Sequence, residues 1–256
     1  MHPILFVGAG PGDPELITLK GARLLAEADL VVYAGSLVPG SMLDPCRADC
    51  EKVDSAPLAL EQFVGLMVER CRAGRRVVRL HSGDSSLYGA TAEQTRLLDA
   101  AGLPWAIIPG VSSFQAAAAA LGAELTVPGV SQSVILTRAE GRSTPMPEGE
   151  SLARLGASRA TLCLFLSATL GQKIQDQLVP HYGADCPVGL VLRASWPDER
   201  IVRCSLGELE RTLKAERIVK QVMMIVGPVL TRQGDASRLY DKAFTHGYRK
   251  AEQPHA

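Results

Sequence analysis

The sequence predicts an α/β protein of two domains with mixed, largely parallel sheets. Short runs rich in Val, Ile and Leu alternate with longer stretches of helical apolar spacing, which is the pattern of helices layered on mainly parallel strands. A length of 256 residues is sufficient for two compact domains. We therefore expect domains at residues 1–113 and 114–230, followed by a polar, aperiodic and loosely held tail at 231–256.

The first domain is predicted to alternate strand and helix throughout. Residues 4–7 form its first strand, and 15–28 a helix in which Leu16, Leu19, Leu24 and Leu25 make an apolar stripe. The later elements are a strand at 30–33, a helix at 58–72, a strand at 76–80, a helix at 92–101 and a strand at 105–108.

The second domain begins after an alanine-rich helix at 114–121, whose five consecutive alanines are strong helix formers. We expect this helix at the junction of the two domains. The later predictions are strands at 133–137, 161–166, 188–192, 201–204 and 221–226, with helices near 148–155 and at 170–181 and 206–215.

Charge and hydropathy exclude several classes of partner. Lys plus Arg number 27 and Asp plus Glu also number 27, so no overall field would attract nucleic acid or an anionic membrane. No apolar run approaches the roughly 20 residues that span a bilayer. The apolar run at 4–7 is too short for a signal peptide. We expect a cytoplasmic protein with no nucleic-acid or membrane partner.

The cysteines do not predict a metal site. No paired CxxC spacing is present and no histidine lies near them, so we expect reduced thiols and no metal. The six cysteines are Cys46, Cys50, Cys71, Cys163, Cys186 and Cys204.

The segment Gly8-Ala9-Gly10-Pro11-Gly12-Asp13-Pro14, called loop 1 below, follows the first strand. Glycines there let the backbone approach a ligand without interference from β-carbons. The segment departs from the dinucleotide fingerprint, because Pro14 stands where that pattern has its third glycine and Pro11 removes an amide. Loop 1 therefore suits a rigid wall for a ligand better than a phosphate cradle, and a plain tight turn is the alternative.

Two further loops follow predicted strands. Loop 2 is His81 to Gly89 and loop 3 is Pro109 to Ser113. Open α/β sheets bind ligands at the carboxyl ends of their strands, so the three loops can converge on one crevice. Asp84 is a candidate acceptor for a ribose or amino group, with a turn or helix cap as the alternative.

Taken together, these loops resemble the tetrapyrrole (corrin/porphyrin) methylases. The resemblance rests on GAGPGDP, RLHSGDSSLYG, PGVSS and VILTRAEGR, and it runs from about Ile4 to Leu230. The segments 33–38, 135–142 and 196–199 are similar to the branch that methylates carbon 11 of precorrin-4. The resemblance implies two α/β domains with S-adenosylmethionine bound in a cleft between them, a tetrapyrrole substrate, S-adenosylhomocysteine as a product, no metal, and a homodimer.

The resemblance also implies donor-binding residues, position by position. Those in the loops have turn or capping roles as alternatives, and those in the second domain have packing roles. They are Pro11, Ser82, Gly83, Asp84, Leu87, Ser112, Ser113, Leu166, Ala194 and Val222.

For the substrate, Arg138 and Arg142 are the candidates, because guanidinium groups match the carboxylates of a precorrin. A solvated surface arginine is the alternative. Tyr88 and His81 are candidates for relaying a proton, with a packing role as the alternative for each. Glu140 is a candidate for orienting one of the arginines through an ion pair, and no general base is assigned. Relatives that methylate uroporphyrinogen have an aspartate directly after the tyrosine that corresponds to Tyr33. This chain has Ala34 instead, which argues against that substrate.

Three other functions stay open at this point. The same methylation can act on cobalt-precorrin-4, and a metal at the ring centre leaves no clear trace in an enzyme's sequence. A ribosomal RNA methyltransferase shares the broad family, although a net charge of zero supplies no basic face. A non-catalytic nucleotide-binding sensor could use loop 1.

Overall fold

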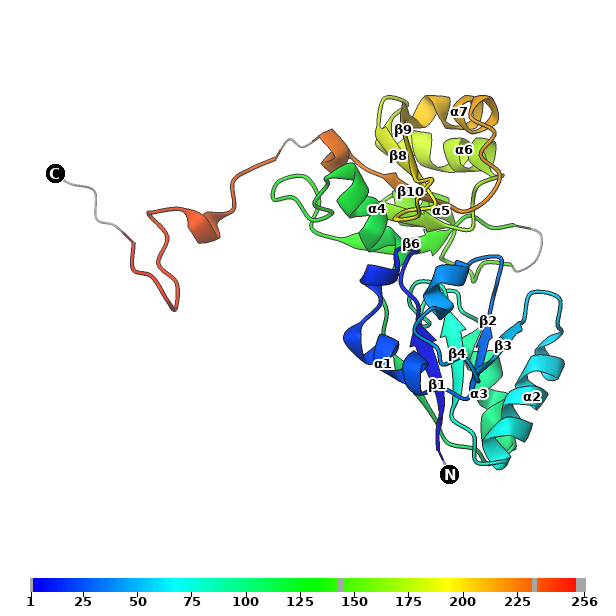
Figure 1. Cartoon of the computed structure of the whole chain (residues 1–256). Coiled ribbons are helices and arrows are strands. Elements are labelled where there is room, and N and C mark those ends of the chain that lie inside the picture. Colours follow the sequence, from blue (N-terminus) through cyan, green and yellow to red (C-terminus); the bar gives the residue numbers. More distant parts are fainter. Residues whose placement is uncertain (1, 142–144, 232–233, 252–256) are drawn as a thin grey trace. The chain divides into compact units, whose positions relative to one another are not determined.

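The computed structural model describes residues 2–141, 145–231 and 234–251, and the chain divides into two compact units. The first unit comprises Met1–Ala117 and Arg193–Arg200, and the second comprises Ala118–Leu192 and Ile201–Ala256. Each unit has a five-stranded sheet with helices packed on it, so the predicted α/β class is confirmed (Figure 1). The chain first passes from one unit to the other within the alanine-rich helix α4 (Ser113–Leu121).

The sheet of the first unit has the strand order β3-β2-β4-β1-β5, and its neighbouring strands pair in parallel. Val7 on the first strand lies opposite Leu80 on one side and Ile108 on the other. Because the strands are parallel, the loops that follow β4, β1 and β5 leave the sheet side by side at one edge. The strands are β1 (Ile4–Gly8), β2 (Leu30–Tyr33), β3 (Glu51–Asp54), β4 (Val77–His81) and β5 (Trp105–Ile108).

Helices cover both faces of this sheet, and the alternation of side chains along β1 explains why. Leu5 and Val7 pack in the core beneath α1, whereas Ile4 and Phe6 enter the core beneath α2 and α3. Figure 1 shows α1 on one side of the strands and α2 and α3 on the other. The helices are α1 (Leu19–Glu27), α2 (Leu60–Arg72) and α3 (Thr91–Ala100).

The first predicted helix begins later than expected. Instead of a helix from Glu15, a single 3₁₀ turn, η1 (Pro14–Leu16), comes first, and α1 starts only at Leu19. The physical reason is a pair of caps. The Asp13 carboxylate accepts a hydrogen bond from the amide of Glu15 (2.8 Å), and the Thr18 hydroxyl accepts one from the amide of Gly21 (3.0 Å).

The second unit has the strand order β6-β7-β10-β8-β9. Its mixed character comes from β10, which runs antiparallel to both β7 and β8, while β6 and β7 are parallel. The strands are β6 (Val134–Arg138), β7 (Thr161–Phe165), β8 (Pro187–Leu192), β9 (Arg200–Ser205) and β10 (Val222–Val226).

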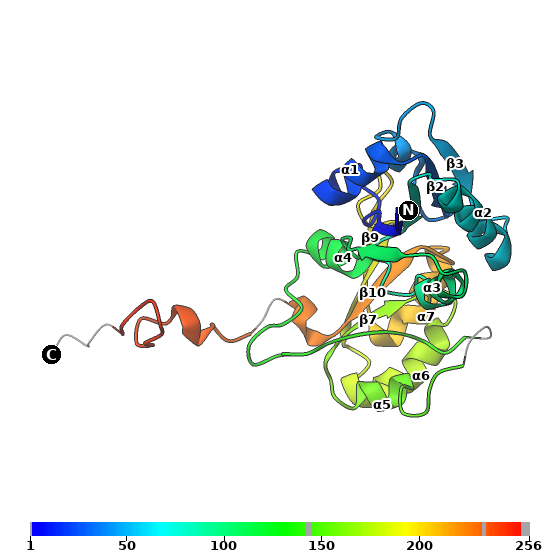
Figure 2. The ribbon, with the colours of Figure 1, turned by 90° about the horizontal axis from the view of Figure 1, so that it is seen from below.

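Three helices pack on this second sheet, and α5 and α6 lie side by side (Figure 2). Leu162, Leu164 and Leu190 of the strands form a core with Ile174 and Leu178 of α6. The helices are α5 (Leu152–Gly156), α6 (Gly171–Tyr182) and α7 (Leu209–Ala215), and short 3₁₀ turns are η2 (Gly40–Leu43), η3 (Leu206–Glu208), η4 (Pro228–Thr231) and η5 (Arg238–Tyr240).

None of the helices in the described ranges is long and apolar enough to cross a membrane.

Candidate functional site

Loops 1, 2 and 3 meet at the carboxyl edge of the first sheet, and three glycines make this approach possible. A β-carbon on Gly8 would lie 2.6 Å from Cα of Gly110 and 2.6 Å from the carbonyl oxygen of Gly83. A β-carbon on Gly110 would likewise lie 2.3 Å from the carbonyl oxygen of Gly83, and real β-carbons do not tolerate such distances, so loops 1 and 3 need glycine where they meet.

Loops 1 and 2 are also joined by backbone hydrogen bonds. The amide of Gly83 donates to the carbonyl of Gly10 (2.8 Å), and the amide of Gly10 donates to the carbonyl of Gly83 (3.2 Å). Both residues have left-handed backbones, with φ of 82° for Gly10 and 64° for Gly83. The two loops therefore form one rigid ledge of backbone at the end of β1 and β4.

Asp84 ties loop 2 to loop 3. Its Oδ2 accepts a hydrogen bond from the amide of Gly110 (2.8 Å), and its Oδ1 accepts from the amide (2.9 Å) and the hydroxyl of Ser86. Burial acts to raise the pKa of this carboxyl, but the hydrogen bonds from Ser86 and Gly110 outweigh it, so the pKa lies below its ordinary value. Asp84 is thus an ionised side chain that positions the loops.

The remaining loop residues implied by the resemblance lie on this same ledge or beside it. Pro11 and Ser112 are buried, and Ser82, Leu87 and Ser113 are partly exposed. Ser113 is the first residue of α4, and the amide of Ser112 donates to the Gln115 side chain (2.9 Å). The Gln115 side chain thus caps the backbone at the start of α4.

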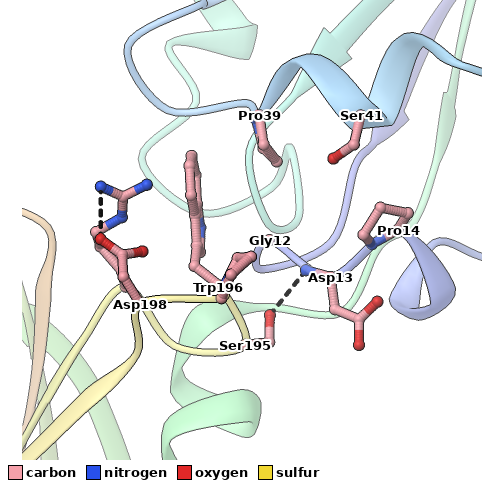
Figure 3. Close-up of a pocket in the computed structure, with 10 residues that line it drawn as sticks. Gly12, Asp13, Pro14, Pro39, Ser41, Ser195, Trp196 and Asp198 are labelled. Carbon is pink, nitrogen blue, oxygen red and sulfur yellow. Dashed lines mark hydrogen bonds and ion pairs between the residues drawn. The ribbon is translucent and has the colours of Figure 1, made fainter.

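A fourth segment joins the three loops from far along the chain. Residues 193–200, the return segment, belong to the first unit and cross loop 1 (Figure 3). The Ser195 hydroxyl accepts a hydrogen bond from the amide of Asp13 (3.0 Å), and Nε1 of Trp196 donates to the carbonyl of Pro11 (3.0 Å). Ala194, which the resemblance implies as a donor contact, is buried here within the first unit.

The return segment and loop 1 border a pocket of about 590 Å³. Loop 1 supplies one wall through Gly12, Asp13 and Pro14, and the turn η2 supplies Pro39 and Ser41 opposite (Figure 3). The rest of the lining belongs to residues 193–198. Sequence reasoning missed Arg193, Ser195, Pro39 and Ser41, and it used Trp196 only as part of a family motif. The sequence signal that could have indicated this contact is Gly12, because a residue without a side chain leaves space for the indole ring of Trp196.

Loop 2 and the residue after it, Ala90, contain strained backbone, and loop 2 has two buried polar atoms. Tyr88 has φ of 54° and Ala90 has φ of 49°, values that non-glycine residues rarely adopt and that are often found at functional sites. Within the described ranges, Nε2 of His81 and Oγ of Ser85 are buried without a hydrogen-bond partner. A ligand or a water molecule would satisfy them, which fits a binding role for this loop.

His81 is a weak base in this structure. Its ring stacks on Phe6 with centroids 5.8 Å apart, and it is buried. Burial, and then the nearby charge of Arg79, lower the pKa of His81 to about 3. The imidazole is therefore neutral at physiological pH, whereas an efficient general base has a pKa near the working pH. Tyr88, by contrast, is 46 % exposed and lies at the surface of loop 2.

In the second unit, the two implied donor contacts differ in character. Leu166 follows β7 with φ of 52° and is 71 % exposed, so a large apolar side chain in a strained conformation faces outward. Val222 begins β10, is buried and pairs with Leu192 of β8. The structure thus favours a ligand role for Leu166 more than for Val222, which has a packing role.

Arg138 is the last residue of β6, and Glu140 follows two positions later. The guanidinium of Arg138 donates to the carbonyl of Pro145 (3.2 Å) and reaches that of Ala139 (3.5 Å). Glu140 forms an ion pair with Lys173 (3.0 Å), and this bond lowers the pKa of the Glu140 carboxyl. Arg142, the second substrate candidate, lies outside the described residues. Across the described ranges, no group of three or more His, Cys, Asp or Glu side chains is arranged to hold a metal ion.

Comparison with known proteins shows which family the chain belongs to. Residues 3–210 match the Tetrapyrrole (Corrin/Porphyrin) Methylases. The chain is 49 % identical over 250 residues to a precorrin-4 C(11)-methyltransferase of Pseudomonas aeruginosa, covering 97 % of this chain and 99 % of the relative.

Two solved structures have the same fold. One is a cobalt precorrin-4 methyltransferase from cobalamin biosynthesis, with a TM-score of 0.86 and 46 % identity, covering 89 % of this chain and 95 % of the other. The second is a uroporphyrin-III C-methyltransferase of Thermus thermophilus complexed with S-adenyl homocysteine, with a TM-score of 0.74 and 29 % identity, covering 91 % of this chain and all of the other (100 %). The glycine-to-glycine ledge, its strained loop 2 and this match over nearly the whole chain lead to one conclusion: the chain belongs to the tetrapyrrole (corrin/porphyrin) methylases.

Proposed function

We propose that this chain transfers a methyl group from S-adenosylmethionine to carbon 11 of precorrin-4, giving precorrin-5 in cobalamin biosynthesis. The observation that carries the proposal is the 49 % identity, over 97 % of the chain, to a relative with that named activity. The departure at Ala34 supports it, because relatives that methylate uroporphyrinogen have an aspartate there.

The residues present fit a donor of this kind. When bound, S-adenosylmethionine supplies a methyl group already activated by its sulfonium, so the protein needs no further activating group for transfer. Loops 1, 2 and 3 bring glycine backbone without side chains together at one sheet edge, and loop 2 adds the unsatisfied atoms of His81 and Ser85. We assign donor contacts to Pro11, Ser82, Gly83, Asp84, Leu87, Ser112, Ser113, Leu166, Ala194 and Val222.

The chain's own contribution to rate is positioning. Rigid loops that fix the donor and the acceptor carbon in line are worth up to roughly 7–11 kcal/mol in favourable cases. Asp84 serves this purpose indirectly, since its bond from the amide of Gly110 joins loop 2 to loop 3 and its two bonds from Ser86 fix loop 2 itself. No side chain is assigned as a general base. The neutral state of His81 and the ion pair of Glu140 leave Tyr88 as the candidate whose exposure suits contact with the substrate.

Arg138 and Arg142 are the proposed partners of substrate carboxylates. Replacing both with alanine should raise KM for the macrocycle roughly 10- to 100-fold, the effect of losing charge-assisted hydrogen bonds. KM for S-adenosylmethionine should stay nearly unchanged, and steady-state kinetics with each substrate varied separately would measure both. Arg211→Gln, an exposed change on α7, is the matched control. Unchanged kinetics in the double variant would remove both arginines from the site.

The decisive assay incubates the enzyme with S-adenosylmethionine labelled in its methyl group and with each tetrapyrrole in turn. Carbon NMR of the product should place the new methyl group at C11 of precorrin-4. Methylation of another carbon, or only of uroporphyrinogen, would refute the proposal. Calorimetry with S-adenosylhomocysteine and with NAD separates the enzyme from a nucleotide sensor, because only the enzyme is expected to bind the demethylated donor selectively.

Cobalt-precorrin-4 is the second candidate substrate. The specific observation that favours it is the 46 % identity and TM-score of 0.86 to a cobalt precorrin-4 methyltransferase. Paired assays with the metal-free and cobalt-containing substrates, compared by kcat/KM, decide between the two routes. We also propose that the protein acts in the cytoplasm as a homodimer without nucleic-acid or membrane partners, and light scattering tests the dimer.

A further inference from the structure

Arg193 occupies a fixed position in the pocket beside loop 1. Its guanidinium carbon lies 4.1 Å from the centroid of the Trp196 ring, and its Nη1 forms an ion pair with Oδ2 of Asp198 (3.0 Å). The backbone of Arg193 is left-handed, with φ of 48°. A guanidinium stacked on an indole and paired on one side has lost most of its freedom before any ligand arrives.

Trp196, on which Arg193 stacks, is itself held firmly. Its Nε1 donates to the carbonyl of Pro11 (3.0 Å), and its ring lies so close to Gly12 that a β-carbon there would overlap with it. The next residue along the chain, Pro197, stiffens the segment. The stack is therefore a preformed part of the first unit, and a ligand that uses it pays little ordering entropy.

Arg193 still has donors to offer. A guanidinium carries five N–H groups, and the ion pair with Asp198 engages Nη1 alone. Among the described residues, Nε of Arg193 is buried without a hydrogen-bond partner, and the side chain as a whole is 35 % exposed. Because Nε is shielded, it is the unpaired N–H groups of the terminal nitrogens that remain for an acceptor in the pocket that Arg193 lines.

The remaining walls are largely apolar, so Arg193 is the cation that the pocket offers to an anionic group. Pro14, Pro39 and Pro197 give the pocket rigid apolar surfaces. Figure 3 shows Ser41 and Pro39 across the pocket from Trp196, with the carboxylate of Asp13 turned away from them. That carboxylate accepts a hydrogen bond from the amide of Glu15 (2.8 Å), which fixes it in this orientation.

We propose that this pocket binds one carboxylate side arm of the macrocycle, with Arg193 pairing with the carboxylate and Trp196 and the prolines packing against the pyrrole edge. A volume of about 590 Å³ accommodates an arm together with the ring that carries it. This inference rests on the proposed function and gives the first unit a substrate-binding side chain, in addition to the proposed roles of Arg138 and Arg142. Asp198 orients the guanidinium from the other side.

The test uses Arg193→Gln and Arg193→Lys in the full-length enzyme. Arg193→Gln should raise KM for precorrin-4 roughly 10- to 100-fold, while KM for S-adenosylmethionine stays within about twofold. Arg193→Lys, which keeps the charge and loses the planar fork, should recover part of the loss. Arg23→Gln is the matched control, because Arg23 is an exposed arginine of α1 in the same unit and forms an ion pair with Glu27.

A binding measurement makes the test independent of turnover. Titration with a stable polycarboxylate porphyrin should show weaker binding by Arg193→Gln than by the wild type or Arg23→Gln, with unchanged calorimetric affinity for S-adenosylhomocysteine. Equal porphyrin affinity in all three proteins overturns the inference. So does an equal loss of affinity for S-adenosylhomocysteine, which would place Arg193 in the donor site or in the general fold. A wild type that binds the porphyrin through Arg193 but methylates no precorrin refutes the proposed function alone.

Discussion

The indole of Trp196 lies against Gly12, where a β-carbon would overlap with the ring. Gly12→Ala should therefore push Trp196 away from the Pro11 carbonyl and open the pocket. The cost expected for such overpacking is ~1–3 kcal/mol in the free energy of unfolding. Urea unfolding followed by tryptophan fluorescence in a Trp105→Phe background would measure it, because Trp196 is then the remaining tryptophan.

Gly65→Ala is the matched control for this change. Gly65 lies inside α2, and a β-carbon there would meet nothing within 4 Å. Because glycine is a poor residue within a helix, this variant should be more stable by ~0.5–1 kcal/mol. If Gly12→Ala were equally harmless and left the Trp196 emission unchanged, the close packing of indole and loop 1 would be wrong.

Asp84 gives a prediction about pH at the same scale. Its folded-state pKa lies below the ordinary value of 3.8, so its ionised form stabilises the fold above that pH. This contribution is lost as the pH falls through the lowered folded-state pKa. Asp84→Asn should cost ~1–3 kcal/mol near neutral pH, because hydrogen bonds to a charged acceptor are lost. The difference in the free energy of unfolding between Asp84→Asn and the wild type should become smaller at acid pH. Urea unfolding at neutral and at acid pH would measure it.

Asp44→Asn serves as the control for this prediction, since Asp44 is an exposed carboxylate of the first unit. It should leave the unfolding midpoint nearly unchanged at either pH. A deficit in Asp84→Asn that stayed constant down to acid pH would mean that shape, rather than charge, is what Asp84 supplies to loops 2 and 3.

Sequence reasoning at the residue scale located loops 1 to 3 but not their partners. Glycines and prolines at strand ends are local signals, so Gly8, Gly83 and Gly110 could be assigned to loops from their neighbours alone. The pairing of Pro11 with Trp196 joins residues 185 positions apart, and nothing in the local pattern of either residue predicts it. The same limit applies to Asp84, whose partner Gly110 lies across the sheet edge.

Among the elements, β4 and α3 are joined beneath loop 2 by the buried side chain of Gln94. Its Oε1 accepts from Nε of Arg79 (3.1 Å), and its Nε2 donates to the carbonyls of Gly89 and Ala90 (3.2 Å each). Gln94→Ala would remove the partner of Nε in the buried Arg79 guanidinium and the side-chain bond to the Gly89 carbonyl, at a cost of ~1–3 kcal/mol in the free energy of unfolding. Chemical denaturation would measure this cost.

The matched control is Gln172→Ala at the start of α6, where the side chain is exposed. It should change the free energy of unfolding by less than ~0.5 kcal/mol. Gln94→Ala should also weaken binding of S-adenosylhomocysteine, because the left-handed backbone at Ala90 loses its support. A stability loss no greater than that of Gln172→Ala would show that Gln94 does not brace loop 2.

Most elements could be predicted because their apolar spacing is local. The strand β3 (Glu51–Asp54) was missed, since its sequence EKVD has no apolar alternation and its first two residues are exposed. It exists because its backbone pairs with β2 and because Asp54 accepts a hydrogen bond from the amide of Gly35 (2.8 Å). Hydrogen bonds of the backbone to a distant strand leave no periodic signal.

The apolar cores of the molecule lie in two units. The sequence predicts the order of the two units along the chain, but not that the chain passes between them more than once. The alternation of strands and helices predicts two successive domains, yet Arg193–Arg200 leaves the second sheet and returns to the first unit. This segment is held against the first unit by the hydrogen bonds of Ser195 and Trp196 with loop 1, which join residues far apart in the sequence. A pocket formed partly by such a return cannot be deduced from local patterns.

The cores contain no residue beyond Leu230 among those described, which leads to a prediction about the tail. The amide of Asp235 donates to the carbonyl of Pro128 (3.0 Å), and beyond it the guanidinium of Arg249 donates to the carbonyl of Leu239 (2.9 Å). Since that second contact lies within the tail, a chain ending at Asp235 should keep the urea midpoint and the affinity for S-adenosylhomocysteine of the full-length protein.

A shorter chain ending at Pro228 is the control that should fail. It removes Val229 and Leu230, which are 1 % and 9 % exposed, and burial of each such side chain is worth ~1.5–3 kcal/mol. Light scattering of the chain ending at Asp235 adds a second reading, because Tyr240 and Tyr248 are exposed at 78 % and 101 %. If that chain folded normally but lost half its mass in solution, the tail would be holding two copies together, and its independence from the rest of the protein would be refuted.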